Sequence, residues 1–177
     1  MRSISRGAMG LAVAILTVLT VGYLLPGTIV VSRTAVIAAP AQTVFPFVNN
    51  ARQLAEWSPL LALDAAAQID FSGPEEGIGS RLAWVSDDPR LGRGNQEILS
   101  SEQPRHVRAR LAFDRRGDAE IRFDLEPRNA GTSVTWTFRA VSGSSPIDRW
   151  RGVLVGRRVG RIYEGGLATL KARLEVE

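Results

Sequence analysis

Apolar residues recur with a period of two through the middle of the chain. From His106 to Phe113 every second side chain is apolar, and Arg108 and Arg110 lie between them. The segments 119–126 and 132–140 repeat this alternation after the turn sequences DRRGD and PRNAG. Such alternation is typical of strands with one buried and one solvated face, and therefore of an antiparallel sheet. Further strands are predicted at 30–39, 68–71, 81–86 and 95–102.

Helical spacing flanks this region on both sides. After Pro40, apolar residues three and four apart predict a short helix that Pro46 kinks or shortens, and a second short helix follows over 51–57. From Pro146 to Glu175 an apolar stripe recurs at the same spacing opposite an arginine-rich face, with Ser145 as the N-cap. A stripe of this length needs a partner surface, which the apolar face of the sheet supplies. The sequence predicts an α+β fold in which an antiparallel sheet wraps around a long C-terminal helix.

The N-terminal segment has the pattern of a membrane-spanning helix. No charged residue occurs between Arg6 and Arg33, a run of 26 positions. Its core, AMGLAVAILTVLTVGYLL, approaches the roughly 20 apolar residues that such a helix needs. We therefore expect residues 1–31 to be an uncleaved membrane anchor and residues 32–177 to be a separate domain. The alternatives are a buried core helix and a cleaved secretory signal, whose apolar core usually has only about 7–15 residues.

Positive charge is distributed unevenly around this segment. Arg2, Arg6 and the amino terminus lie on one side, and only Arg33 lies close on the other. Cytoplasmic flanks of membrane helices carry an excess of Lys and Arg. The bias predicts a single-pass protein whose N-terminus is inside and whose domain is on the extracytoplasmic side.

Composition narrows the classes of function. The 177 residues include no cysteine and one histidine, His106, which excludes disulfide scaffolds, iron–sulfur clusters, thiolate zinc sites and multi-histidine metal sites. The net charge is +4, but the chain lacks the basic stripes interleaved with aromatic residues that indicate nucleic-acid binding. We predict no cofactor, no metal and no nucleic-acid partner.

Three stretches of sequence carry a resemblance to a known family. They are IAAPAQTVFPFVNNARQLAEWSPL (Ile37–Leu60), GTSVTWTFRA (Gly131–Ala140) and VGRIYEGGLATLKARLE (Val159–Glu175). Together with the order of the elements, they resemble the polyketide cyclase/dehydrase branch of the START-like, or SRPBCC, superfamily over residues 32–177. The resemblance implies a helix-grip fold with a cavity between a concave sheet and the long helix. It implies no single activity, since the superfamily includes lipid carriers, cyclases and hydroxylase components.

The wall of that cavity can be predicted from the inward-facing positions. We place Trp57 at its mouth and Gln96 as a polar handle, while Gly152, Gly156 and Gly160 leave ligand space or allow close approach of the sheet. The predicted wall comprises Trp57, Trp84, Gln96, Ile98, Leu111, Phe113, Phe123, Trp136, Phe138, Gly152, Gly156, Gly160 and Tyr163. Alternatively the aromatic residues fill the core and Gln96 is a satisfied amide. The glycines could also indicate a kinked helix, a helix that begins after Gly160, or a small-residue contact within a membrane.

Candidate catalytic groups are few. His106 follows a turn and is expected at the surface, and Asp87 and Asp88 are expected in a solvated loop. We therefore expect a non-enzymatic, membrane-tethered binding module for a small hydrophobic or lipid-like ligand. One alternative is a polyketide cyclase/dehydrase-type enzyme in which Tyr163 would move a proton. Another is a ligand-free scaffold whose arginine-rich helix face contacts acidic lipid or a partner.

Overall fold

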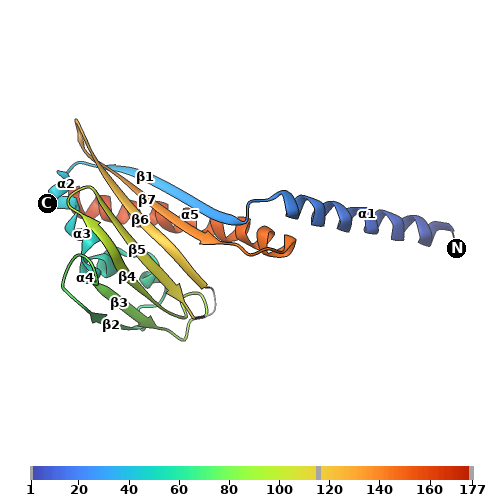
Figure 1. The fold of residues 1–177 in the computed structure, drawn as a ribbon, viewed down its shortest axis with the longest axis horizontal. Coiled ribbons are helices and arrows are strands. Elements are labelled where there is room, and N and C mark those ends of the chain that lie inside the picture. The colour runs from blue at the N-terminus through green and yellow to red at the C-terminus, as the bar shows by residue number, and fades with distance from the viewer. Residues whose placement is uncertain (1, 115–116, 176–177) are drawn as a thin grey trace.

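A computed structural model describes residues 2–114 and 117–175, and for residues 2–6 the backbone alone. An N-terminal helix, α1 (Arg2–Leu24), precedes an α+β domain (Figure 1). The helices of the domain are α2 (Ala41–Val44), α3 (Pro46–Asn49), α4 (Ala51–Trp57), the 3-10 turn η1 (Leu61–Leu63) and α5 (Pro146–Glu175). The strands are β1 (Thr28–Ile37), β2 (Gln68–Ser72), β3 (Arg81–Val85), β4 (Arg93–Glu102), β5 (His106–Phe113), β6 (Gly117–Arg128) and β7 (Gly131–Val141).

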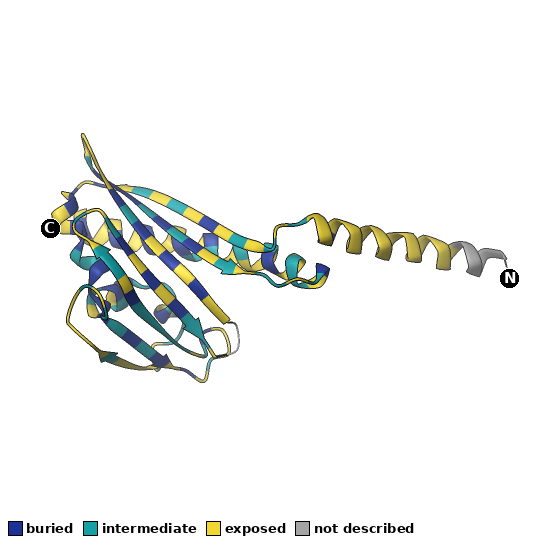
Figure 2. Ribbon diagram, viewed as in Figure 1, coloured by how far each residue is buried: buried dark blue, intermediate teal, exposed yellow. Residues whose placement is uncertain are grey.

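All seven strands form one antiparallel sheet in the order β1-β7-β6-β5-β4-β3-β2. The predicted alternation is confirmed, because buried residues alternate with exposed ones along β5 and β6 and with half-buried ones along the middle of β7 (Figure 2). The buried positions share one face of the sheet, where Val107, Phe123 and Trp136 occur in register. A bulge in β4 after Ile98 interrupts the pairing with β5. The apolar face of the sheet therefore faces the helices, as the period of two requires.

The short helices begin and end where the local sequence favours it. Pro46 is the first residue of α3 and separates it from α2, so the kink expected at this proline is confirmed. Asn50 caps α4, since its side-chain oxygen accepts from the backbone N–H groups of Arg52 (2.8 Å) and Gln53 (3.2 Å). β1 runs from Thr28 to Ile37 and not from 30 to 39, because its ladder with β7 ends at Thr132.

The long helix α5 is continuous from Pro146 to Glu175, as predicted. The backbone N–H of Asp148 donates to Oγ of Ser145 at 3.1 Å, which confirms the N-cap. Tyr163, Leu167 and Leu170 are buried against the rest of the domain. Because the helix includes all three glycines of the 152–160 segment, a helix that begins only after Gly160 is wrong. A Cβ atom at Gly160 would lie 2.5 Å from the guanidinium of Arg33, so the glycines instead let β1 approach the helix closely.

The N-terminal helix α1 projects from the domain and is exposed along its apolar length (Figure 2). The segment Gly7–Leu24 is long and apolar enough to cross a membrane, and 6% of it is buried. It is not a core helix of the domain. The side chains of Arg2 and Arg6, on which the predicted orientation rests, lie outside the described part, as do Arg115 and Arg116 of the predicted DRRGD turn.

Two adjacent glycines of α5 provide a matched test of helix–sheet packing. A Cβ at Gly166 would lie 2.8 Å from Trp136 and 2.9 Å from Pro59, whereas nothing lies within 4 Å of one at Gly165. Gly166→Ala should lower the free energy of unfolding by about 1–3 kcal/mol through overpacking. Gly165→Ala should raise it by about 1 kcal/mol through helix propensity alone. Chemical denaturation of both variants measures the difference, and shifts of the same sign would contradict the packing described.

Candidate functional site

An apolar cavity of about 420 Å³ lies between the sheet and the first half of α5. Leu111 of β5, Ala119 of β6, and Phe138 and Ala140 of β7 form the sheet side of its wall. From α5 the wall receives side chains along the segment from Asp148 to Tyr163, and Leu60 and Leu63 contribute from the η1 region. The volume falls within the range of roughly 300–1,000 Å³ of ordinary small-molecule sites. The domain can therefore enclose a small, largely apolar molecule.

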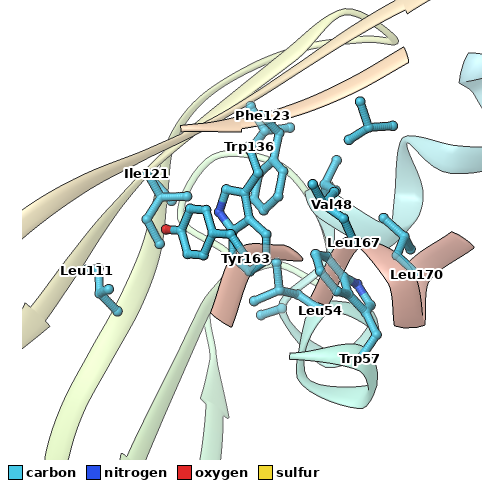
Figure 3. Close-up of a cluster of buried hydrophobic side chains, with 14 of the residues drawn as sticks. Val48, Leu54, Trp57, Leu111, Ile121, Phe123, Trp136, Tyr163, Leu167 and Leu170 are labelled. Atoms are coloured by element: carbon cyan, nitrogen blue, oxygen red, sulfur yellow. The ribbon is translucent and has the colours of Figure 1, made fainter. Parts of the chain in front are cut away.

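The other half of the space under α5 is filled by aromatic side chains. Trp136 stacks on Tyr163 with ring centroids 3.6 Å apart and on Phe123 at 5.1 Å. Trp57 packs edge-on against Trp136 at 5.2 Å, and its indole N–H donates to the carbonyl oxygen of Phe47 at 2.9 Å (Figure 3). Such aromatic pairs contribute about 0.5–1.5 kcal/mol each beyond their buried area. This aromatic cluster (Trp57, Phe123, Trp136 and Tyr163) closes one end of the cavity.

Tyr163 places a polar atom at the boundary between the cluster and the cavity. The residue is 5% exposed and lines the cavity, and its hydroxyl points toward Leu111 and Ile121 (Figure 3). Within the described residues, neither this hydroxyl nor the indole nitrogen of Trp136 has a hydrogen-bond partner. A buried polar group without a partner costs about 1–3 kcal/mol. The hydroxyl is therefore available to a hydrogen-bonding group on a molecule in the cavity.

Burial also determines the ionisation of this phenol. Removal from water raises the pKa of Tyr163 above its ordinary value. The hydroxyl therefore remains protonated at every physiological pH. It can donate a hydrogen bond to a carbonyl or carboxylate oxygen, but it cannot act as a general base there.

Charged residues lie at the rim of the cavity. Arg151 contacts Asp148 at 3.5 Å, and both side chains are largely solvated. Arg90 binds Asp88 at 2.6 Å, and this hydrogen bond lowers the pKa of the Asp88 carboxyl to about 2. Arg158 of α5 and Asp118 of β6 also line the cavity, and both are exposed. The polar groups thus surround the opening, and the interior beyond them is apolar up to Tyr163.

The structure divides the predicted wall into two groups. Those that line the cavity are Leu111, Phe113, Phe138, Gly152 and Tyr163. Those that lie away from it are Trp57, Trp84, Gln96, Ile98, Phe123, Trp136, Gly156 and Gly160. Trp57 is 2% exposed inside the aromatic cluster, so its predicted place at the mouth is wrong. Gln96 faces inward beside Leu82 and Leu111 in the sheet but outside the cavity.

Several residues of the cavity wall are not among those predicted from the sequence. Ala119 continues the inward parity of Ile121 and Phe123, so its position could have been predicted from the alternation. Leu60 and Leu63 belong to a short turn without periodicity and gave no comparable signal. Val159 and Ile162 lie on the predicted apolar stripe of α5, and only the packing shows that they border open space.

Comparison with known proteins agrees with this architecture. The model of a family described as "Polyketide cyclase / dehydrase and lipid transport" matches residues 28–175. Sequence comparison with curated proteins finds no significant match. Protein CV1439 from Chromobacterium violaceum superposes with a TM-score of 0.59 at 18% identity, covering 85% of this chain and 99% of its own.

Two further solved structures share the fold. SA2116 from Staphylococcus aureus, described as a protein of unknown function, has a TM-score of 0.65 at 11% identity, with 84% of this chain and 94% of its own covered. Ara h 8.0201 has a TM-score of 0.63 at 14% identity, with 85% and 100% covered. At these identities the likeness concerns the fold alone, and it confirms the predicted helix-grip arrangement.

The buried phenol predicts an alkaline pH dependence of stability. Folding favours the neutral phenol because burial raises the pKa of Tyr163, so ionisation of this residue leaves stability unchanged below pH about 10 and lowers it as the pH rises above that value. Between pH about 10 and 11, the free energy of unfolding should fall by up to about 1.4 kcal/mol per pH unit more in the wild type than in Tyr163→Phe. Denaturation of both proteins in detergent measures these slopes, and equal slopes would contradict the burial of the hydroxyl.

Proposed function

The chain belongs to the polyketide cyclase/dehydrase and lipid transport family, and on that premise we propose that it binds a small hydrophobic molecule while α1 tethers it to a membrane. The observation that carries the proposal is the cavity of about 420 Å³ under α5. Its interior is apolar, and one polar hydrogen-bond donor, the hydroxyl of Tyr163, is buried at its inner end. A ligand with an apolar body and one carbonyl or carboxylate oxygen fits this wall best. The cavity argues against a scaffold with a filled core.

The same wall favours binding over catalysis. A cyclase or dehydrase acting on this cavity needs a group that takes up a proton near the substrate. Among the described lining residues, the carboxylates Asp118 and Asp148 lie at the solvated rim. Tyr163 is deep, but its raised pKa keeps it protonated. The arrangement therefore suits a carrier or receptor of an apolar molecule.

The tether rests on the length and exposure of α1. Eighteen residues, Gly7–Leu24, rise about 27 Å as a helix, which nearly equals the hydrocarbon thickness of about 30 Å. An apolar helix left in water would expose a continuous hydrophobic surface, whereas a bilayer buries it. Placement of the domain at a membrane would keep the cavity beside a store of apolar molecules.

Native mass spectrometry of the full chain, released from its host membrane, tests the binding. The wild type should carry a small molecule, and Ala119→Phe should lose it, because a phenyl ring at this position enters the cavity beside Leu111 and Ala140. Ala168→Phe adds the same ring on the exposed side of α5 and should retain the molecule. A molecule bound equally by all three proteins lies outside the cavity, and an empty wild type contradicts the proposal.

The intact mass measured in the same experiment tests the tether separately. An uncleaved anchor gives the full 19.2 kDa chain in the membrane fraction, resistant to carbonate extraction. A chain shortened after the apolar segment and recovered in the soluble fraction would show that α1 is a secretory signal. That result would leave the cavity proposal standing.

A further inference from the structure

The start of α5 lies directly against the end of α1. The indole N–H of Trp150 donates to the carbonyl oxygen of Val18 at 3.0 Å, and Arg149 donates to the carbonyl oxygens of Leu25 (3.0 Å) and Tyr23. Gly22 has no side chain where Pro146 packs, since a Cβ there would lie 2.7 Å from that of Pro146. If α1 spans a bilayer, as proposed above, these contacts place the first turns of α5 beside the last turns of the span.

Large apolar side chains are exposed at this end of the domain. Ile147, Trp150 and Leu154 are 57%, 37% and 65% exposed and follow one another at helical spacing. Val141, at the end of β7, is 81% exposed and pairs with Thr28 just after α1. We call these four residues the apolar tip. A soluble domain gains nothing from such exposure, whereas side chains of this kind, and tryptophan above all, are favoured at membrane interfaces.

Positive charge accompanies the apolar tip. The segment from Pro146 to Arg161 contains five arginines and a single acidic residue, Asp148. Arg157, Arg158 and Arg161 form no ion pair among the described residues, and Arg151 is 74% exposed. Arginines close to an anionic lipid surface are attracted to its headgroups. Exposed apolar residues and unpaired arginines on one helix are the combination that suits an anionic bilayer surface.

We infer that the first turns of α5, together with Val141, dock into the surface of the bilayer that α1 spans, with the arginines on anionic lipid headgroups. The inference rests on the proposed tether. Trp150 lies level with Val18, six residues and about 9 Å before the end of α1, so docking places its indole among the acyl chains below the headgroups.

Docking in this way also determines where the cavity opens. Val141, Arg151, Val155 and Arg158 belong both to this end of the domain and to the rim of the cavity. The strand ends that frame the rim lie on the side from which α1 leaves (Figure 1). The opening therefore faces the lipid, and an apolar molecule can pass between bilayer and cavity without crossing bulk water.

Tryptophan fluorescence of the full chain in vesicles tests this placement. Trp57, Trp84 and Trp136 are at most 5% exposed, so quenching by phosphatidylcholine brominated on its acyl chains reports on Trp150. The wild type should be quenched in brominated vesicles, and Trp150→Phe should lose that quenching completely. As a control, Ile78→Trp in the Trp150→Phe background places an exposed indole in the β2–β3 turn, away from α1, and should remain unquenched.

The outcomes separate docking from tethering. If the chain floats with the vesicles but the wild type and Trp150→Phe are quenched equally, or neither is quenched, docking is wrong and the tether stands. A surface occupied by a second copy of the chain would give that unquenched result. If the chain does not float with the vesicles, the proposed membrane tether is wrong, and the docking proposal, which depends on the tether, is wrong too.

The contribution of the arginines to docking is tested by comparing vesicles with and without anionic lipid. Addition of phosphatidylglycerol should increase the quenching of wild-type Trp150, and the double variant Arg151→Gln/Arg158→Gln should lose this increase. Both arginines are on the rim and neither contacts α1 in the described structure, so the variant keeps the helix contacts of Arg149 and Trp150. Quenching of the wild type that is independent of phosphatidylglycerol would overturn the role of anionic headgroups.

Discussion

The close approach of α5 to the sheet is the contact on which the rest of the domain depends. Along its first half, Gly152 and Gly156 bring the helix backbone within contact distance of Ile29 on β1. Further along, Gly166 accommodates the edge of Trp136. These positions fix the height of the helix above the sheet, because interiors are packed too densely to absorb an added methyl group without movement. That height determines whether the space between them is filled or hollow.

Side-chain volume then divides the interior into two parts. Under the second half of α5, Trp57, Phe123, Trp136 and Tyr163 fill the space with stacked and edge-on rings. Under the first half, small residues line the space, among them the paired Ala119 and Ala140 of the sheet and Gly152 of α5, and they leave a cavity. Tyr163 belongs to both parts, since its ring stacks in the cluster and its hydroxyl is buried without a partner. A rigid core thus supports the one polar atom at the inner end of the hollow.

The position of the hollow along α5 connects the domain to its N-terminal helix. The cavity lies under the end of α5 that contacts α1, and the exposed apolar residues are found at the same end. A carrier that takes an apolar molecule from a membrane exposes the molecule to water on the way. This exposure is unfavourable, because apolar surface in water costs about 25 cal/mol per Å². In the docking proposed above, the opening lies against the bilayer, which removes this exposure to water.

The sequence alone determined the features that depend on local periodicity. Strands β5, β6 and β7, the helix from Pro146 to Glu175 and the membrane-length segment before Arg33 follow from spacing and run length, which neighbouring residues fix by themselves. The tertiary structure decided which of the inward-facing residues enclose the cavity. Trp136 has the same inward parity as Phe138, and Trp57 was expected at the mouth, yet both fill the core. Gly160 faces Arg33 and not a ligand space. The reason is that a cavity is the difference between the volume enclosed by a curved sheet and the side chains that distant segments bring into it, and no local pattern encodes that difference.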